Sequence, residues 1–322
     1  MNSAEFFSRR SGMTLAGAAA GCSKPLALAI GVFDGVHLGH RKLLNEVIAI
    51  AAELDAVPVA LTFDPHPRKV LNPSAPPVLL CDLAQRVELL KAAGMHKVAV
   101  VDFTLDFAAT PPEEFLDMLF AEVPRLAAVG VGSEWRFGCR GMGNVKLLGE
   151  YAAKRNFRLA AVPELVLNDE VVSASSIRRA VAGGDLNKAE RLLGYRYYLA
   201  GKVASGYGIA GSKLDCPTAN IEPDAGVLPP DGVYSGIVTV DGKRYGATVN
   251  IGVAPTYGRT ADLRRRIEAH LLGFSGSLYG KNLRLELGEY LRSEQCFASE
   301  EALKKQIMCD VENIRRWVGG KL

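Results

Sequence analysis

The sequence is poor in three features, and each absence argues against a class of protein. Its six cysteines are scattered and form no Cys-x-x-Cys pair, which argues against a zinc site or a disulfide framework and favours a reducing compartment. No apolar stretch approaches the roughly 20 residues that a membrane helix needs. The net charge is only +3, whereas a nucleic-acid-binding chain usually carries a basic stripe. We therefore expect a cytoplasmic protein that binds neither membranes nor nucleic acid.

The length allows more than one hydrophobic core. A chain of 322 residues is too long for one ordinary domain, so two domains are expected. Hydrophobic residues make up 48% and charged residues 23%, which is typical of a globular protein. Nothing in the sequence indicates an obligate protein partner.

Residues 1–24 precede the first recognisable element. Arg9-Arg10 and the run that follows to Cys22 resemble a twin-arginine or lipoprotein leader. The apolar part of this run is short and consists mostly of Ala and Gly, which partition poorly into a membrane. We instead predict a disordered and dispensable extension, with Met13 as an alternative start.

The first half of the chain alternates between two patterns. Short apolar runs, typical of buried strands, lie at 26–32, 57–63, 97–103, 127–132 and 157–162. Segments with helical spacing separate them, at 38–54, 84–93, 112–120 and 147–154. Strands separated by helices predict a parallel sheet with right-handed crossovers. We expect an α/β nucleotide-binding domain over residues 25–194, ending in short helices at 175–182 and 186–193.

The pattern changes after Gly194. Alternating strands separated by Gly-rich turns are predicted at 199–203, 232–240, 244–251, 266–272 and 282–291. Five or six such strands at short spacing predict a compact antiparallel barrel over residues 195–322. An amphipathic pattern over 300–318 predicts a helix that closes it.

A His-x-Gly-His tetrad carries the strongest chemical signal. His37 and His40 lie where a buried strand passes into a helix, and side chains three apart on a helix face the same way. Gly39 lets a phosphate approach the backbone, and the helix N-terminus adds free N–H groups and positive potential. The alternatives are a metal pair or plain surface residues, but two ligands without a third make a poor metal site. We predict a triphosphate site.

The sequence offers no P-loop for a second nucleotide site. Residues 206–211 spell Gly-x-Gly-x-x-Gly, but a dinucleotide-binding loop must open a helix, and Pro217 follows in a strand-like context. The same stretch lacks the Lys that a P-loop carries before Ser or Thr. Any ATP chemistry in the second half must therefore use another architecture.

Several blocks, in order along the chain, resemble one known family. Residues 31–40, 62–67, 131–138 and 172–178 resemble the four motifs of the nucleotidylyltransferase domain in prokaryotic bifunctional riboflavin kinase/FAD synthetases. Residues 217–220, Pro-Thr-Ala-Asn, resemble the flavokinase motif, and 228–234, 250–256 and 267–272 continue the likeness. The resemblance implies that riboflavin, FMN and ATP are substrates, that FAD is the final product, and that Mg²⁺ is required.

The resemblance implies that FMN attacks the α-phosphorus of ATP in the first domain, with His37 and His40 as catalytic residues and Arg178 on the β- and γ-phosphates. The serines of the fourth block have helix capping as an alternative role. The implied ATP-binding residues are Gly31, Phe33, Asp34, Gly39, Ser173, Ser175, Arg178 and Gly211. The implied flavin-binding residues are Phe63, His66, Pro67, Glu134 and Phe137.

In the second domain the resemblance implies that Thr218 and Asn220 coordinate Mg²⁺ and that Glu268 is the general base for the riboflavin 5′-hydroxyl. The alternatives are a polar turn for the first two residues and a surface ion pair for Glu268. The family usually has Arg, Gly and Phe where this chain has Ser212, Asp215 and Cys216. An FMN adenylyltransferase with a weakened kinase domain therefore stays open, as does a non-catalytic flavin-binding regulatory protein.

Overall fold

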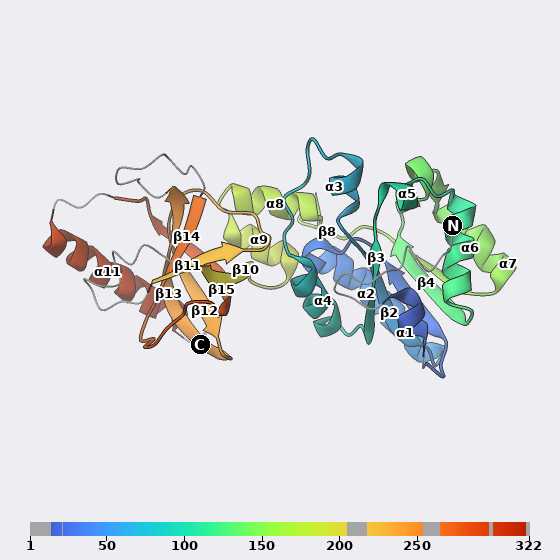
Figure 1. Cartoon of the computed structure of the whole chain (residues 1–322), viewed down its shortest axis with the longest axis horizontal. Coiled ribbons are helices and arrows are strands. Elements are labelled where there is room, and N and C mark those ends of the chain that lie inside the picture. The colour runs from blue at the N-terminus through green and yellow to red at the C-terminus, as the bar shows by residue number, and fades with distance from the viewer. Residues whose placement is uncertain (1–13, 21, 205–217, 254–264, 296–298, 320–322) are drawn as a thin grey trace. The chain divides into compact units, whose positions relative to one another are not determined.

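A computed structural model describes residues 14–20, 22–204, 218–253, 265–295 and 299–319 (Figure 1). The chain divides into two compact units, Met1–Ala174 and Ser175–Leu322, and each is described by itself. The predicted boundary at Gly194 stays a prediction, since the helices between Ala174 and Gly194 fall with the second unit. Among the described residues, no helix is long and apolar enough to cross a membrane.

The first unit is built on a five-stranded parallel sheet, as predicted. Its strand order is β3-β2-β1-β4-β7, and each neighbouring pair is parallel. All five residues of β1 are buried, because helices cover both faces of this central strand. The strands are β1 (Leu26–Ile30), β2 (Val57–Asp64), β3 (Lys97–Asp102), β4 (Leu126–Gly132) and β7 (Arg158–Val162).

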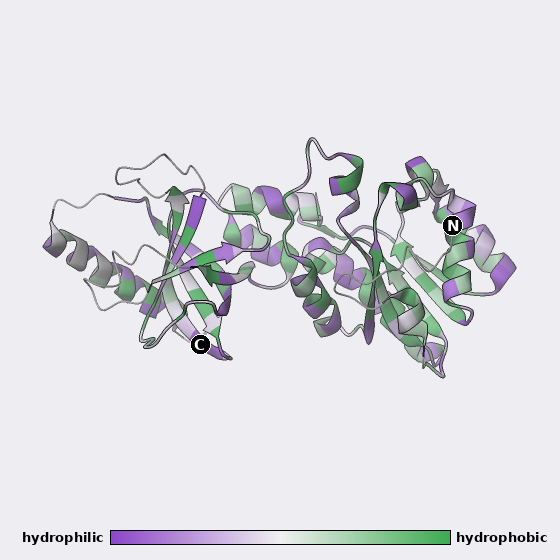
Figure 2. Ribbon diagram, in the orientation of Figure 1, coloured by the Kyte–Doolittle hydropathy of each residue, from purple (hydrophilic) through white to green (hydrophobic). Residues whose placement is uncertain are grey.

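Two hydrophobic clusters, one on each face of the sheet, form the core of this unit. One contains Leu44 of α2 (Leu38–Glu53) and Leu90 of α4 (Leu83–Ala92). The other contains Leu116 of α6 (Pro112–Glu122) and Leu148 of α7 (Val145–Arg155). Figure 2 shows mostly hydrophobic residues along these strands and alternating character along the helices. The shorter elements are η2 (Asp34–Val36), α3 (Pro67–Leu71), α5 (Leu105–Ala108), β5 (Arg136–Phe137), η3 (Cys139–Gly141), β6 (Gly143–Asn144), β8 (Val166–Leu167) and β9 (Glu170–Val171).

One short helix lies within residues 1–24, the predicted disordered extension, and the extension itself stays a prediction. Residues Leu15–Ala19 form helix α1, which Thr14 caps by accepting a hydrogen bond from the N–H of Gly17. Leu15 is fully buried in the second of the two clusters, and the Nζ of Lys97 donates to the carbonyl of Ala18 at 2.9 Å. A five-residue helix is too short to produce a periodic apolar pattern, so tertiary contacts hold it.

The second unit is a closed antiparallel barrel with a helix packed on it, as predicted. Its strand order is β10-β11-β14-β13-β12-β15. Ile314 and Val318 of α11 (Glu300–Val318) pack with Ile237. The other elements are α8 (Ala174–Ala182), α9 (Leu186–Leu193), β10 (Tyr198–Ala204), β11 (Thr218–Pro223), β12 (Gly232–Val240), β13 (Lys243–Val253), β14 (Arg265–Leu271) and β15 (Asn282–Arg292). Gly211, Ser212, Asp215 and Cys216 lie outside the described residues.

Candidate functional site

The turn between β1 and α2 is fixed by the buried carboxylate of Asp34. Its oxygens accept hydrogen bonds from the backbone N–H groups of Leu80 at 3.0 Å and Cys81 at 3.2 Å. Phe33 and Gly35 on either side have positive φ angles of 54° and 74°, so the chain reverses sharply here. Asp34 therefore anchors the turn to the segment before α4. A direct contact between Asp34 and ATP stays a prediction.

His37 caps the N-terminus of α2. Its Nδ1 accepts a hydrogen bond from the backbone N–H of His40 at 3.3 Å, and the two imidazole rings stack with centroids 3.6 Å apart. Because Nδ1 is the acceptor, the proton of a neutral His37 ring lies on Nε2. The structure thus brings the two predicted catalytic histidines together at a helix N-terminus, where backbone N–H groups and the helix dipole favour an anion.

His40 is held as a neutral imidazole. Burial, the neighbouring His37 and then Arg86 lower its pKa well below the usual value. Its Nδ1 is buried and has no hydrogen-bond partner among the described residues. The ring of Phe33 meets it edge-on at 5.3 Å and is itself fully buried. The side chain of Phe33 therefore supports His40, and its predicted contact with ATP stays a prediction.

Close packing explains why glycine occupies two predicted positions. A Cβ atom on Gly39 would lie 3.1 Å from the carbonyl oxygen of Val172 and 3.2 Å from the imidazole of His37. A Cβ on Gly31 would lie 3.0 Å from the ring of Phe33. Both glycines thus allow the rings of the site to approach the backbone, whatever their contacts with phosphate.

The remaining predicted ATP-binding residues lie around the start of α8. Ser173 directly precedes this helix, and Ser175 and Arg178 lie on it. Ser175 is exposed and Arg178 is half-buried. The last two belong to the second unit, so their approach to the ATP phosphates stays a prediction.

An aromatic cluster in the first unit contains two of the predicted flavin-binding residues. Phe63 contacts Phe103 and Phe107, and Phe137 stacks on Trp135 with centroids 4.6 Å apart. Phe115 joins the two groups, because its ring lies near Phe107, Trp135 and Phe137. The sequence did not single out Phe103, Phe107, Phe115 or Trp135. Phe103 and Trp135 lie beside strand ends, which was an available signal, whereas Phe107 and Phe115 lie on α5 and α6.

The other predicted flavin-binding residues lie in two different settings. Residues His66 and Pro67 begin α3: the Nδ1 of His66 accepts a hydrogen bond from the N–H of Arg68 at 3.0 Å, and Pro67 is the first helical residue. Glu134 is exposed, between β4 and β5. Capping is therefore a structural role of His66, and its contact with flavin stays a prediction.

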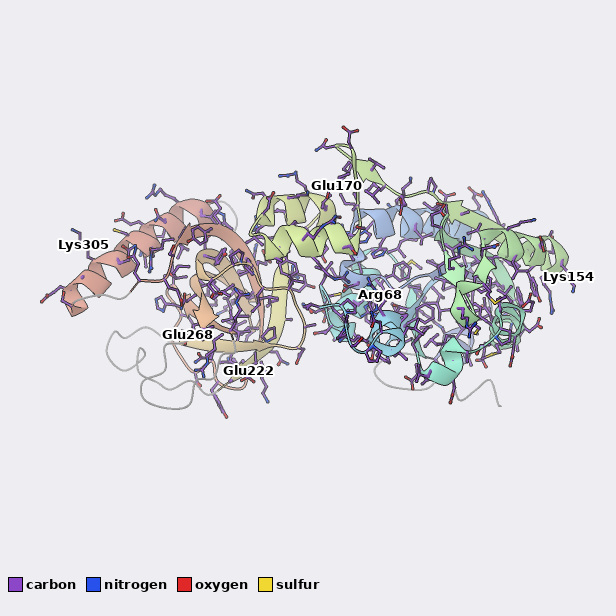
Figure 3. All side chains as sticks on the ribbon, turned by 90° about the horizontal axis from the view of Figure 1, so that it is seen from above. Arg68, Lys154, Glu170, Glu222, Glu268 and Lys305 are labelled. Atoms are coloured by element: carbon purple, nitrogen blue, oxygen red, sulfur yellow. The ribbon has the colours of Figure 1, made fainter. Side chains whose placement is uncertain are left out.

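In the barrel, the strand register places the predicted kinase residues side by side. Asn220 of β11 lies opposite Glu268 of β14, and Asn250 of β13 lies opposite Glu268 on its other side. Thr218 lies opposite His270. Cross-strand partners have Cβ atoms about 5 Å apart on the same face, so Asn220, Glu268 and Asn250 form a polar row. Figure 3 labels Glu268 on this part of the barrel.

The environment of Glu268 favours its protonated form. Burial and the nearby Glu294 raise the pKa of its carboxyl group, and Arg266 opposes that rise. The Nδ2 of Asn250 donates to Glu294 at 2.7 Å, while the buried Oδ1 of Asn250 has no partner among the described residues. Neither Asn250 nor Glu294 was predicted as a site residue. Asn250 begins one of the motif-like runs, whereas Glu294 follows β15 and gives no periodic signal.

Comparisons with known proteins agree with both units. A family model described as FAD synthetase matches residues 20–176, and one described as riboflavin kinase matches residues 193–318. The bifunctional riboflavin kinase/FMN adenylyltransferase of Pseudomonas fluorescens is 34% identical, over 89% of this chain and 91% of that protein. The enzyme of the same name from Escherichia coli K12 is 31% identical, over 91% and 92%.

A solved structure extends the likeness to the fold. A protein from Streptococcus pneumoniae, described as a macrolide-efflux protein, matches with a TM-score of 0.81 and 25% identity. The match covers 92% of this chain and 96% of the pneumococcal chain. From the two matched models and the relatives that span nearly its whole length, the chain belongs to the family of bifunctional riboflavin kinase/FMN adenylyltransferases.

Proposed function

We propose that the chain makes FAD from riboflavin at two separate sites, the turn before α2 and the polar row of the barrel. The chain is an enzyme of FAD biosynthesis by way of FMN, as its family membership indicates. The observation that carries the first assignment is the stacked pair of His37 and His40 at the N-terminus of a long helix. The observation that supports the second is the register that aligns Asn220 with Glu268.

Adenylyl transfer in the first unit requires positioning and charge neutralisation. A phosphate oxygen of FMN attacks the α-phosphorus of ATP, the bond from that phosphorus to the β-phosphate oxygen breaks, and pyrophosphate leaves. The Nε2–H of a neutral His37 ring is the donor that we assign to a phosphate oxygen, because Nδ1 accepts the N–H of His40. Neutral His40 adds a second imidazole, and the N-terminal N–H groups of α2 add positive potential.

Phosphoryl transfer in the second unit requires a base. The riboflavin 5′-hydroxyl oxygen attacks the γ-phosphorus of ATP, its proton passes to the carboxylate of Glu268, and ADP leaves. A carboxyl group with a raised pKa is a stronger proton acceptor in its ionised form, which suits this role.

The oxygen donors of the barrel fit the Mg²⁺ that accompanies ATP. The residues that would hold it are Thr218 and Asn220, and the ion would neutralise phosphate charge. The buried Oδ1 of Asn250, which has no hydrogen-bond partner among the described residues, lies in the same row and is a hard oxygen of the kind that Mg²⁺ binds. A site completed by ATP oxygens and water is what Mg²⁺ prefers. A cytoplasmic location, where ATP is available, is part of the same proposal.

The test uses the full chain with riboflavin, ATP and Mg²⁺, followed by chromatographic separation of FMN and FAD. We expect FMN to appear first and FAD to follow. FMN supplied directly with ATP should give FAD and pyrophosphate. His37→Ala should stop FAD formation and leave FMN formation intact, because the two sites lie on separate units.

Other outcomes separate the alternatives. FAD formed from FMN, with no product from riboflavin, would indicate a weakened kinase domain. Flavin binding without either product would contradict the proposal and indicate a non-catalytic flavin-binding protein.

A further inference from the structure

Arg86 is a fully buried arginine that the sequence did not single out. It lies on α4, and its side chain has no solvent exposure. Its Nη1 donates to the carbonyl of Phe63 at 2.8 Å and lies 3.4 Å from the hydroxyl of Thr62. That hydroxyl in turn donates to the carbonyl of Val32, in the turn that leads to the histidine pair. Arg86 therefore lies at the edge of the sheet where β2 ends, beside the first candidate site.

The guanidinium of Arg86 is not neutralised by the described part of the protein. Its Nε and Nη2 are buried and have no hydrogen-bond partner there, and no described carboxylate lies within ion-pair distance. A buried cation with no counter-charge is strongly unfavourable, since burial removes its hydration and the contacts of Nη1 replace that hydration only in part. Such a group is retained where another molecule supplies the missing negative charge.

The groups around Arg86 do not provide that charge. Burial raises the pKa of the Cys81 thiol to about 12, so this thiol is neutral. Asp34 adds to the rise, and Arg86 opposes it through its charge and through a contact with the thiol, which supplies no negative charge. The carboxylate of Asp34 lies beyond ion-pair distance of Arg86, and its oxygens accept the N–H groups of Leu80 and Cys81. On the other side lies His40, which Arg86 disfavours as a cation. The site thus combines a buried positive charge, a helix N-terminus and two imidazoles.

We propose that Arg86 is a positioning residue for adenylyl transfer, whose buried charge is balanced by the triphosphate of ATP bound at His37 and His40. This inference rests on the function proposed for the first unit. Arg86 acts through the electrostatic field of its charge, which attracts phosphate and also helps to keep His40 neutral. A fixed charge in a water-excluded site attracts phosphate strongly and needs no reorganisation when the substrate binds.

A purely structural role makes the opposite prediction for stability. If Arg86 only ties α4 to the end of β2, replacing it should weaken the protein and leave ATP affinity alone. If the charge of Arg86 is balanced only when ATP is bound, then removing the charge should leave the stability of the ATP-free protein unchanged or higher and should weaken ATP binding. The reason is that replacing a buried charge by an apolar group of similar volume is often neutral or stabilising.

The experiment compares Arg86→Met, Arg86→Lys and the control Lys91→Met in the full chain. Lys91 is an exposed cation on the same helix. FAD formation from FMN gives the KM for ATP, and FMN formation from riboflavin by the same preparations is the internal control. We expect Arg86→Met to raise the KM for ATP about tenfold or more, as for the loss of a charge-assisted interaction. Arg86→Lys and Lys91→Met should stay within about threefold, since the first keeps the buried charge and the second lies outside the site.

The second readout is thermal unfolding of the first unit. In a Trp317→Phe background, Trp135 reports on that unit alone, because the chain has two tryptophans. ATP should raise the unfolding temperature of the parent, and this rise should be largely lost in Arg86→Met, whose ATP-free unfolding temperature equals or exceeds that of the parent. Four results would each overturn the inference. Three concern Arg86→Met: an unchanged KM for ATP in the folded variant, an ATP-free unfolding temperature below that of the parent, or a failure to fold. The fourth is a rise in the KM for ATP in Arg86→Lys that equals the rise in Arg86→Met. Absence of FAD formation by the parent protein would instead contradict the proposed function.

Discussion

Gly39→Ala should damage FAD formation without unfolding the protein. The new Cβ would lie 3.1 Å from the Val172 carbonyl oxygen and 3.2 Å from the His37 ring, so one of them must move by a few tenths of an ångström. His37 is buried and stacked at 3.6 Å on His40, so the displacement passes to the histidine pair. Alanine in a helix is up to ~1 kcal/mol more favourable than glycine, which offsets part of the strain.

The magnitude follows from the sensitivity of catalysis to position. A misplacement of 1 Å costs roughly 100-fold in rate, so a shift of a few tenths of an ångström should lower kcat for FAD formation about threefold to tenfold. The assay is conversion of FMN to FAD under saturating ATP, with FMN formation from riboflavin measured in parallel. The kinase rate should not change.

Gly149→Ala is the matched control. Gly149 lies within α7 of the same unit, and its added Cβ would meet only Leu159 Cδ2, at an ordinary distance of 3.7 Å. This variant should be stabilised by up to ~1 kcal/mol and keep both activities. A folded Gly39→Ala protein with the FAD-forming rate of the unchanged chain would refute the reasoning.

Three further predictions concern the barrel and the N-terminus. Glu268→Gln should lower FMN formation about 100-fold or more and spare FAD formation from supplied FMN, as measured with each substrate separately; equal loss of both would contradict a base confined to the barrel. Because Glu268 must be ionised to act as a base and its pKa is raised, FMN formation should fall as the pH drops through that raised pKa. Glu294→Gln should move this fall to lower pH, because it removes a negative charge that raises the pKa of Glu268. An unmoved pH–rate profile would count against the influence of Glu294 on Glu268. A chain that starts at Met13 should keep its unfolding temperature. Leu15→Ala should lower the free energy of unfolding by about 2–5 kcal/mol, measured by chemical denaturation, because Leu15 is fully buried. A decrease within error of zero would show that α1 is dispensable.

Local sequence patterns were sufficient for the main elements. The apolar run of β1 and the spacing of Leu43, Leu44 and Val47 in α2 report burial within a few residues, so the strand, the helix and the tetrad between them were predictable. The same holds for the alternation of Ile267, Glu268 and Ala269 in β14. Patterns of this kind failed for α1, whose five residues are too few to show a period.

Contacts between distant segments were decided only by the tertiary structure. The sequence by itself determined that two histidines lie at a helix start and that a carboxylate lies on a strand. It did not determine that Asp34 anchors the segment before α4, that Asn250 and Glu294 lie beside Glu268, or that Arg86 is buried without a counter-charge next to His40. Those facts depend on how sheets and helices pack, because the energy of a buried charge or amide depends on the neighbours that folding brings to it and not on its position along the chain.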